Sequence, residues 1–244
     1  MSVKGARASV RPPDLFDRRR RLALAYAPPP TMERVEYWLY YLYKTAVTNE
    51  GLMTDFALAR RAMVDSQLRP QGVTDTAVLT AMGKVAREDH VPEAARTVAY
   101  TDRAIPVDGG TIIPPAPLGR LLTAALPIPG ERALVVSPAP GYAAAVLREI
   151  GLDVVEAHAA DALTEVPDGP FDLILIEGAV AEPPESFTDA LALGGRLITA
   201  LLVHGGGTRL AIGRNVDGVV GYTRFADSEI AALPGYTRPP IFTF

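Results

Sequence analysis

Apolar runs and helical patterns alternate through the second half of the chain. Residues 132–136 form an apolar, β-branched run, 137–141 read Ser-Pro-Ala-Pro-Gly, and 142–147 are rich in alanine. This order predicts a strand, a tight loop and a helix, the unit that opens a nucleotide-binding α/β sheet. Small residues would let the loop backbone approach a ligand, and the amides at the helix N-terminus would face it.

Further elements are predicted after this unit. They comprise strands over 153–156, 171–176 and 196–203, a helix over 187–193 that Gly194 and Gly195 end, a hairpin of 208–214 with 219–225, and a last strand over 241–244. Continuous apolar runs such as 171–176 are typical of buried parallel strands. The pattern therefore predicts an α/β fold with a doubly wound, mostly parallel sheet and antiparallel pairing late in the chain.

Helices are also predicted before the sheet. Asp55 is a candidate N-cap for a helix over 56–68, and Thr74 or Asp75 for one over 77–85. A Gly109-Gly110 turn and a helix over 118–125 follow. We therefore expect a domain over 53–244, with an α-rich N-terminal lobe (53–130) and a Rossmann-like core (131–244).

Residues 1–52 differ from the rest in composition. They carry nine Lys/Arg and five Asp/Glu, a net charge of +4, against −8 for residues 53–244. We expect a basic disordered tail, or an arm for an acidic surface, and an aromatic helix over 32–47. That helix is shorter than the ~20 apolar residues that span a bilayer. Met53 is a candidate start, in which case this extension is not native.

Composition excludes several kinds of site. The chain has no cysteine, which rules out disulfides and thiolate ligands. Its three histidines are not at metal-ligand spacing, so no metal is expected. The acidic main domain makes nucleic acid an unexpected partner. We expect a cytoplasmic protein without a membrane span; its oligomeric state is open.

Several blocks of the chain together resemble protein-L-isoaspartate O-methyltransferases. They are Arg61-Ala-Met-Val-Asp-Ser-Gln-Leu68, Gly72-Val-Thr-Asp75, Val91-Pro92, Ala99-Tyr-Thr-Asp102 with Ile105-Pro106, Gly141-Tyr-Ala-Ala-Ala-Val-Leu147, Phe171-Asp172 and Gly194-Gly-Arg-Leu197. The resemblance covers about residues 55–244 and implies a Rossmann-like methyltransferase. Such enzymes transfer a methyl group from S-adenosylmethionine to the carboxyl of L-isoaspartyl residues in damaged proteins, which is protein repair. The implied partner is a protein or peptide that contains isoaspartyl residues.

The implied chemistry needs few catalytic side chains. A substrate carboxylate has a pKa near ~4, so it is ionised at pH 7 without a general base. The sulfonium donor is intrinsically reactive, and the protein mainly aligns and desolvates the reactants. The absence of a His/Asp constellation is therefore compatible with this activity.

Two motifs depart from the family pattern. Counting back from Gly141, Val135 stands at the family's acid, Ser137 at its first glycine and Ala139 at its second. Loss of the acid would remove a contact to a charged group, on the order of 1.5–3 kcal/mol. The substrate motif Thr-Ile-Ser-Gln-Pro-Tyr reads Thr-Ile-Ile-Pro-Pro-Ala here, so only Thr111 retains a hydroxyl. The resemblance makes Ser137, Ala139, Gly141 and Tyr142 candidate cofactor contacts and Thr111 a candidate catalytic residue.

The middle of the core is short. Only residues 142–170 separate Gly141 from the strand at Phe171, about half of what three helices and two strands require. One βα unit is therefore shortened or missing. Either 153–156 is the second strand, with Glu156 on the ribose, or it is the third, with Asp161 in an adenine-side loop. Glu177 follows a buried strand at the edge where ligands bind, and is a further candidate.

Two functions of different classes are consistent with these residues. The first is an S-adenosylmethionine-dependent carboxyl methyltransferase, as the family resemblance implies. The alternative is a catalytically silent protein of the same fold, a pseudoenzyme that acts as a binding or scaffold module. The two prolines of the loop, Val135 and the altered substrate motif favour this alternative.

Overall fold

The computed structural model describes residues 55–139 and 141–237. The expected helix over 32–47, the basic tail and the strand over 241–244 lie outside these residues. The described residues fall within one compact unit, Thr54–Phe244.

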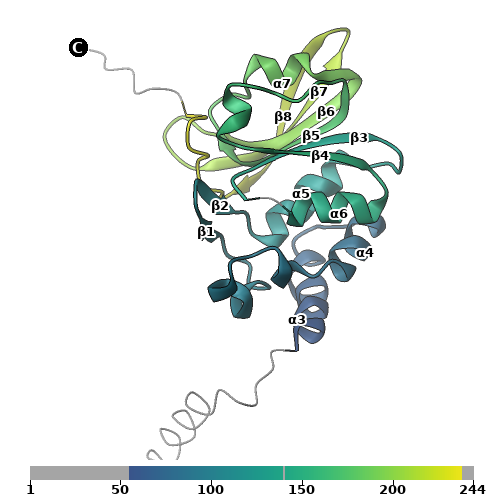
Figure 1. The fold of residues 1–244 in the computed structure, drawn as a ribbon, viewed down its shortest axis with the longest axis vertical. Coiled ribbons are helices and arrows are strands. Elements are labelled where there is room, and N and C mark those ends of the chain that lie inside the picture. The colour runs from purple at the N-terminus through teal and green to yellow at the C-terminus, as the bar shows by residue number, and fades with distance from the viewer. Residues whose placement is uncertain (1–54, 140, 238–244) are drawn as a thin grey trace, which may run out of the picture. The chain divides into compact units, whose positions relative to one another are not determined.

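A six-stranded sheet forms the core of this unit (Figure 1). Its spatial order is β4-β3-β5-β6-β7-β8, with parallel pairing from β4 to β6 and antiparallel pairing from β6 to β8. The strands are β3 (Arg132–Ser137), β4 (Asp153–His158), β5 (Phe171–Val180), β6 (Leu191–Leu202), β7 (Thr208–Val216) and β8 (Val219–Ser228). This confirms the predicted mostly parallel α/β fold with late antiparallel strands.

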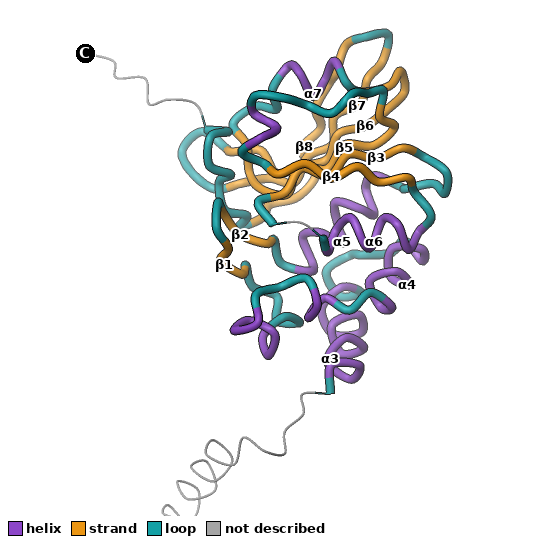
Figure 2. Tube along the Cα trace, in the orientation of Figure 1, coloured by secondary structure: helices purple, strands orange, loops and turns teal. Residues whose placement is uncertain are grey.

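Helices cover the two faces of the sheet unequally (Figure 2). They are α3 (Phe56–Met63), α4 (Thr76–Lys84), α5 (Pro115–Ala125), α6 (Tyr142–Ile150), α7 (Glu185–Asp189), the π-helix Val64–Leu68 and the 3₁₀ turns Arg87–Asp89, Glu93–Val98 and Asp161–Leu163. α5 and α6 lie on one face and the short α7 on the other (Figure 1). None of these described helices is long and apolar enough to cross a membrane.

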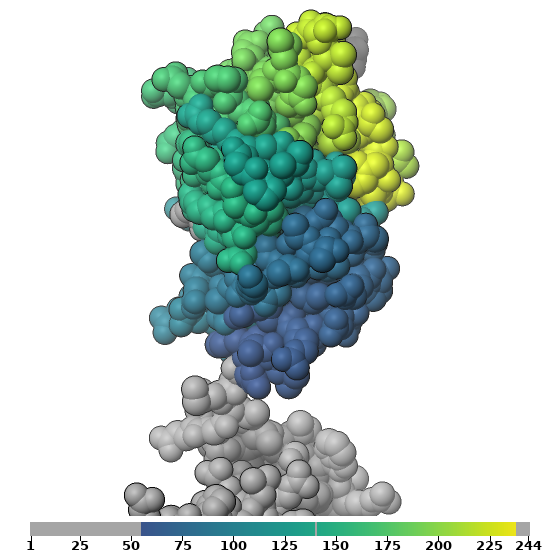
Figure 3. Space-filling view, turned by 90° about the vertical axis from the view of Figure 1, so that its right-hand side faces the viewer, coloured from purple at the N-terminus to yellow at the C-terminus, as the bar shows by residue number. Residues whose placement is uncertain are grey.

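The N-terminal lobe is built from capped helices, as predicted. The side chain of Asp55 accepts the amide of Leu58 at 3.0 Å, and that of Asp75 accepts the amide of Val78 at 2.9 Å. The strands β1 (Ile105–Val107) and β2 (Gly110–Ile112) form an antiparallel hairpin after them. Figure 3 shows the lobe, in blue, packed directly against the core.

Two apolar clusters lie on opposite faces of the sheet. The larger one joins inward residues of β3, β5 and β6 to α4, α5 and α6. The smaller one lies on the α7 face and includes Phe187, Leu233 and Tyr236. Alternate residues of β5 enter the two clusters, as the two-residue period of a strand requires.

The shortened middle segment is visible in the topology. β4 pairs directly with β3 in parallel, with Val135 opposite Glu156. Asp153–His158 is therefore the second strand, which decides between the two alternatives drawn from the sequence. The connection from β4 to β5 contains one 3₁₀ turn and no α-helix, so one βα unit is missing from the described sheet.

The predicted helix over 187–193 is wrong in its second half. α7 ends at Asp189, and Leu191 already pairs with Phe171 as part of β6. Gly194, at φ +76°, and Gly195 do not end a helix but belong to a bulge in β6, where the register with β5 shifts. Pairing with β5 outweighs the local helical pattern.

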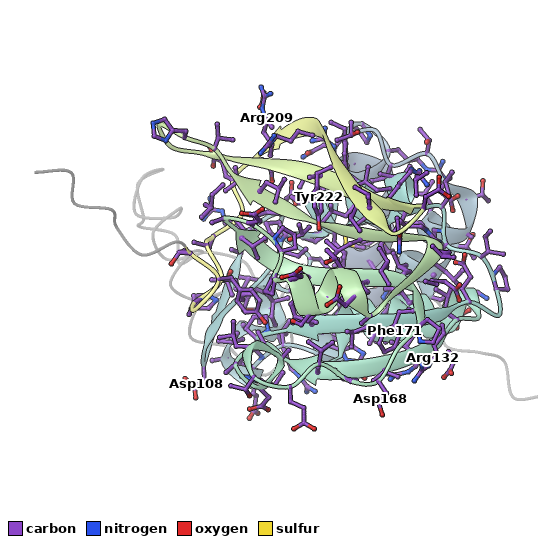
Figure 4. The ribbon with its side chains drawn as sticks, turned by 90° about the horizontal axis from the view of Figure 1, so that it is seen from above. Asp108, Arg132, Asp168, Phe171, Arg209 and Tyr222 are labelled. Atoms are coloured by element: carbon purple, nitrogen blue, oxygen red, sulfur yellow. The ribbon has the colours of Figure 1, made fainter. Side chains whose placement is uncertain are left out.

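The first residues of β3 and β5 are in contact. The guanidinium carbon of Arg132, on β3, lies 4.6 Å from the centre of the Phe171 ring, on β5 (Figure 4).

Candidate functional site

A small pocket lies at the carboxyl ends of β3 and β4. Its volume is about 150 Å³, and its lining residues are Val135, Ser137, Glu156, Ala157 and His158. The parallel register sets Ser137 opposite His158 and Val135 opposite Glu156, which brings two distant segments to one edge. Open α/β sheets bind ligands at this edge.

Glu156 is the one carboxylate in this pocket. Its side chain is 27% exposed, and one oxygen accepts the Arg148 guanidinium at 2.6 Å. Arg148 comes from α6 and also donates to the carbonyl of Val154 at 2.9 Å. The ion pair holds Glu156 near the carboxyl end of β4, two residues before His158, where a carboxylate oxygen can accept from ligand hydroxyls.

The loop after β3 is closed on itself. The hydroxyl of Ser137 donates to the carbonyl of Ala139 at 2.6 Å and accepts the amide of Ala139 at 3.2 Å. Pro138 has no amide hydrogen. Val135 is buried in the core and supplies no polar atom. The loop thus uses its own polar groups instead of presenting them to the pocket.

Gly141 is the N-cap residue of α6, and His90 packs against it. Its φ of +125° suits glycine, and no side chain caps the helix. A Cβ built on Gly141 would lie 2.5 Å from Nδ1 of His90. Burial lowers the pKa of His90, although the nearby Asp89 and Glu156 raise it. His90 therefore lies directly on the candidate cofactor loop.

Tyr142 points into the core. Its side chain is buried, and its hydroxyl has no hydrogen-bond partner among the described residues. The guanidinium carbon of Arg87 lies 4.7 Å from the centre of its ring. Tyr142, which was predicted to contact the cofactor, thus lies in the core next to the fully buried Arg87.

The β1–β2 hairpin covers this edge. A Cβ built on Gly110 would lie 3.0 Å from Cβ of Pro138 and 3.7 Å from Cδ of Pro234. One built on Gly109 would lie 3.6 Å from Cε1 of His158. The turn between β1 and β2 therefore rests on Pro138, which follows β3, and on His158, the last residue of β4.

Glu177 is buried near the pocket but does not line it. It is 2% exposed and belongs to β5. Burial raises the pKa of Glu177 to about 7, while a hydrogen bond with Ser137 and the charge of Arg87 lower it. A carboxyl group with this environment is near half-protonation at neutral pH.

Two predicted residues lie apart from the pocket. Thr111 is half-buried on β2, where it pairs with Pro106. Asp161 is exposed, and its carbonyl accepts the hydroxyl of Thr164 at 2.9 Å. Three larger surface hollows of about 460 to 610 Å³ contain none of the predicted site residues. Of the predicted set, the structure brings together Ser137 and Glu156 in the pocket, with Ala139 and Gly141 in the adjoining loop.

Sequence reasoning missed three residues around the site: Arg87, His90 and Arg148. Arg148 could have been found from its place on the predicted helix, one turn before the strand that carries Glu156. The contacts of Arg87 and His90 join the lobe to the core, and no local pattern reports such contacts.

Comparison of the sequence with known proteins identifies the family of this chain. The family model described as protein-L-isoaspartate(D-aspartate) O-methyltransferase (PCMT) matches residues 59–166. A protein-L-isoaspartate O-methyltransferase of Methylorubrum populi is 38% identical over 187 aligned positions, and the match covers 66% of this chain and 87% of the relative. The chain belongs to the protein-L-isoaspartate O-methyltransferase family. A second family member, from Marinobacter nauticus, is 33% identical over 201 aligned positions, and the match covers 72% of this chain and 88% of the relative.

Solved structures show the same fold. A protein-L-isoaspartate O-methyltransferase aligns with a TM-score of 0.60 at 20% identity, over 72% of this chain and 66% of the other. A family structure from Plasmodium falciparum, in complex with S-adenosyl-L-homocysteine, aligns with a TM-score of 0.58 at 19% identity, over 71% of this chain and 97% of the other. The expected Rossmann-like methyltransferase fold is confirmed.

Proposed function

We propose that this family member binds S-adenosylmethionine at the carboxyl ends of β3 and β4 and methylates the carboxyl of L-isoaspartyl residues in proteins. The observation that carries the proposal is the position of Glu156. It faces a pocket at the edge where α/β sheets bind nucleosides, next to the loop that begins α6. Family membership adds the substrate class.

The residues present suit the nucleoside part of the cofactor. Glu156 offers a carboxylate to paired ribose hydroxyls, and Arg148 fixes its orientation. The hydrophobic wall of Val135 and Ala157 lines the same space. At about 150 Å³ the pocket is smaller than the ~300–1,000 Å³ of most ligand sites. The proposal therefore requires the β1–β2 turn to move when the whole cofactor binds.

The proposed reaction requires no acid or base from the chain's own residues. Bound S-adenosylmethionine supplies an electrophilic methyl group, and the substrate carboxylate is the nucleophile. An isoaspartyl carboxylate is ionised at pH 7, so no residue must remove a proton from it. The chain's residues align the two groups and exclude water from them. Thr111, on the covering hairpin, is the residue we assign to the substrate side.

Calorimetric titration with S-adenosylhomocysteine tests the cofactor site. We expect micromolar binding to the full chain and a loss of about tenfold or more in Glu156→Gln, because a charge-assisted hydrogen bond contributes ~1.5–3 kcal/mol. Arg148→Gln is the matched control: it breaks the same ion pair but keeps the carboxylate, so it should weaken binding less. No binding at millimolar ligand would refute the cofactor site.

A methylation assay tests the substrate class. An isoaspartyl peptide and its aspartyl isomer are compared with a labelled methyl donor. We expect methyl transfer to the isoaspartyl peptide alone. Binding of the cofactor without transfer to either peptide would refute the assigned substrate. Failure of both experiments would favour the silent binding module, for which the comparisons give no support.

A further inference from the structure

The 3₁₀ turn after α4 joins segments from both sides of the candidate site. Its first residue, Arg87, is fully buried. Nε of Arg87 donates to the carbonyl of Ala99 at 2.9 Å, and Nη2 donates to the carbonyl of Ile113 at 2.7 Å. The guanidinium carbon of Arg87 also lies 4.7 Å from the centre of the Tyr142 ring. One side chain thus contacts three separate segments of the chain.

The contact with Ile113 lies on the substrate side of the site. Ile113 directly follows β2, two residues after Thr111, and is itself fully buried. It precedes Pro114, the N-cap residue of α5. The hydrogen bond from Arg87 therefore holds the chain at the point where the β1–β2 hairpin ends and α5 begins. The turn of the hairpin can move, as the proposed cofactor binding requires, while this end stays in place.

The contact with Tyr142 lies on the cofactor side. Tyr142 is the first residue of α6, it follows Gly141, and it is 2% exposed. Its ring lies over the guanidinium within the distance of a cation–π contact. His90, the C-cap residue of the same 3₁₀ turn, packs on Gly141, and its ring centre lies 6.1 Å from that of Tyr142. The turn therefore supports the start of α6 at two points.

The shape of the guanidinium allows these contacts to be made together. Its planar fork donates in several directions while its face stacks on an aromatic ring, which the compact ammonium group of a lysine does not do. Burial of this charge is costly, and Nη1 of Arg87 has no hydrogen-bond partner among the described residues. Stability alone would favour an apolar side chain at this position. The links to Ile113 and Tyr142 are what the arginine adds.

We propose that Arg87 is a positioning residue that couples the substrate side of the site to the cofactor loop. It sets the end of the hairpin that carries Thr111 relative to the start of α6. This role rests on the function proposed above, in which the methyl donor and the carboxylate must be aligned. A misplacement of about 1 Å can lower the rate of such a reaction by as much as ~100-fold.

The coupling can be measured without any ligand, by hydrogen–deuterium exchange. Tyr142→Leu removes the aromatic face that Arg87 contacts. Tyr142→Phe is the matched control, because it removes only a hydroxyl that has no hydrogen-bond partner among the described residues. We expect the amides of residues 111–113 to exchange about fivefold faster in Tyr142→Leu than in the native chain or in Tyr142→Phe.

The exchange of β7 shows whether such an effect is local, since β7 lies apart from Arg87 in the sheet order. Unchanged exchange over 111–113 in Tyr142→Leu would overturn the proposal, whether or not the chain binds S-adenosylmethionine. An equal increase over β7 would also overturn it, because the variant would then have lost stability throughout.

Methylation kinetics give the second readout. Arg87→Lys keeps the charge but loses the fork, so kcat for an isoaspartyl peptide should fall about tenfold or more, while KM for S-adenosylmethionine changes less than about threefold. Arg209→Lys, at an exposed arginine of β7, is the matched control and should leave both values unchanged. A kcat for Arg87→Lys equal to that of the control would overturn the proposal, whereas an inactive native chain would refute the proposed function instead.

A double variant tests whether Arg87 and Tyr142 act as one link. Tyr142→Leu should also lower kcat, and adding it to Arg87→Lys should cost little more, because both changes break the same contact. Independent, multiplying losses would overturn the coupling. If Arg87→Lys does not fold, the exchange and kcat of Tyr142→Leu decide the proposal.

Discussion

His90 packs directly on Gly141, since a Cβ at Gly141 would lie 2.5 Å from Nδ1 of the imidazole. Gly141 also has a φ of +125°, which side chains other than glycine rarely adopt. Gly141→Ala should therefore lower the free energy of unfolding by roughly 2–4 kcal/mol, through backbone strain and overpacking. Urea denaturation measures this loss.

Two further variants separate the two causes. His90→Ala in the Gly141→Ala background removes the clash but not the strain, so we expect recovery of only part of the lost stability. Gly221→Ala is the control, because a Cβ there meets nothing within 4 Å. Full recovery in the double variant would show that the backbone conformation at Gly141 carries no strain.

Glu177→Gln should stabilise the fold in a pH-dependent way. Burial raises the pKa of Glu177 from 4.5 to about 7. Between these values the unfolded chain releases a proton that the folded chain keeps, so native stability falls as the pH rises through this window. The variant lacks this loss. Its free energy of unfolding should exceed that of the native chain by on the order of 2–3 kcal/mol at pH 7.5 and by little at pH 4.5. A gap that is the same at both pH values would contradict the assignment.

The elements that the sequence predicted well are those with a local signal. Asp55 and Asp75 cap helices because their side chains reach amides three residues ahead. The hairpin at Asp217 follows from a turn whose residues adopt positive φ, +53° at Asp217 and +85° at Gly218. Such signals depend on neighbours in the chain and can be read without the fold.

The parts that failed depend on distant contacts. Leu191 and Gly194 look like the end of a helix, but pairing with β5 draws them into β6. At the site, Glu156 was predictable because it ends the predicted strand 153–156, which the structure extends to His158. The influence of the Arg87 charge on the buried Glu177 was not predictable, because Arg87 comes from the lobe, ninety residues earlier in the chain. Contacts between lobe and core decide which candidates reach the pocket.

Tyr100→Phe should destabilise the lobe. The hydroxyl of Tyr100 accepts Nε of Arg60 at 2.7 Å and the amide of Arg87 at 3.2 Å, and donates to Glu88. Its removal leaves a buried amide and a buried carboxylate short of a partner, a loss of about 1–3 kcal/mol. Thermal unfolding of the variant is the measurement. Tyr222→Phe is the control, since its buried hydroxyl has no hydrogen-bond partner among the described residues. Equal effects of the two variants would count against this account.

Glu131→Gln should destabilise the amino-terminal edge of the sheet, because Arg196 depends on it. Arg196 is 6% exposed, and both terminal nitrogens bond the Glu131 carboxylate, at 2.7 and 2.6 Å. Arg196 also donates to the carbonyls of Ala125 and Leu126 at the end of α5. Removing the carboxylate leaves a nearly buried guanidinium without its counter-charge, and we expect a loss of roughly 2–4 kcal/mol in urea denaturation.

The exposed ion pair of Arg209 and Asp227 provides the matched comparison. Its N···O distance of 2.7 Å is similar, but the two side chains are 50% and 82% exposed. Asp227→Asn should therefore change stability by less than ~1 kcal/mol, because water screens the pair. If the two amide variants lost equal stability, burial would not be the reason for the strength of the Arg196–Glu131 pair. A loss of stability in Glu131→Gln alone would instead show that the Arg196–Glu131 pair holds α5 to the sheet.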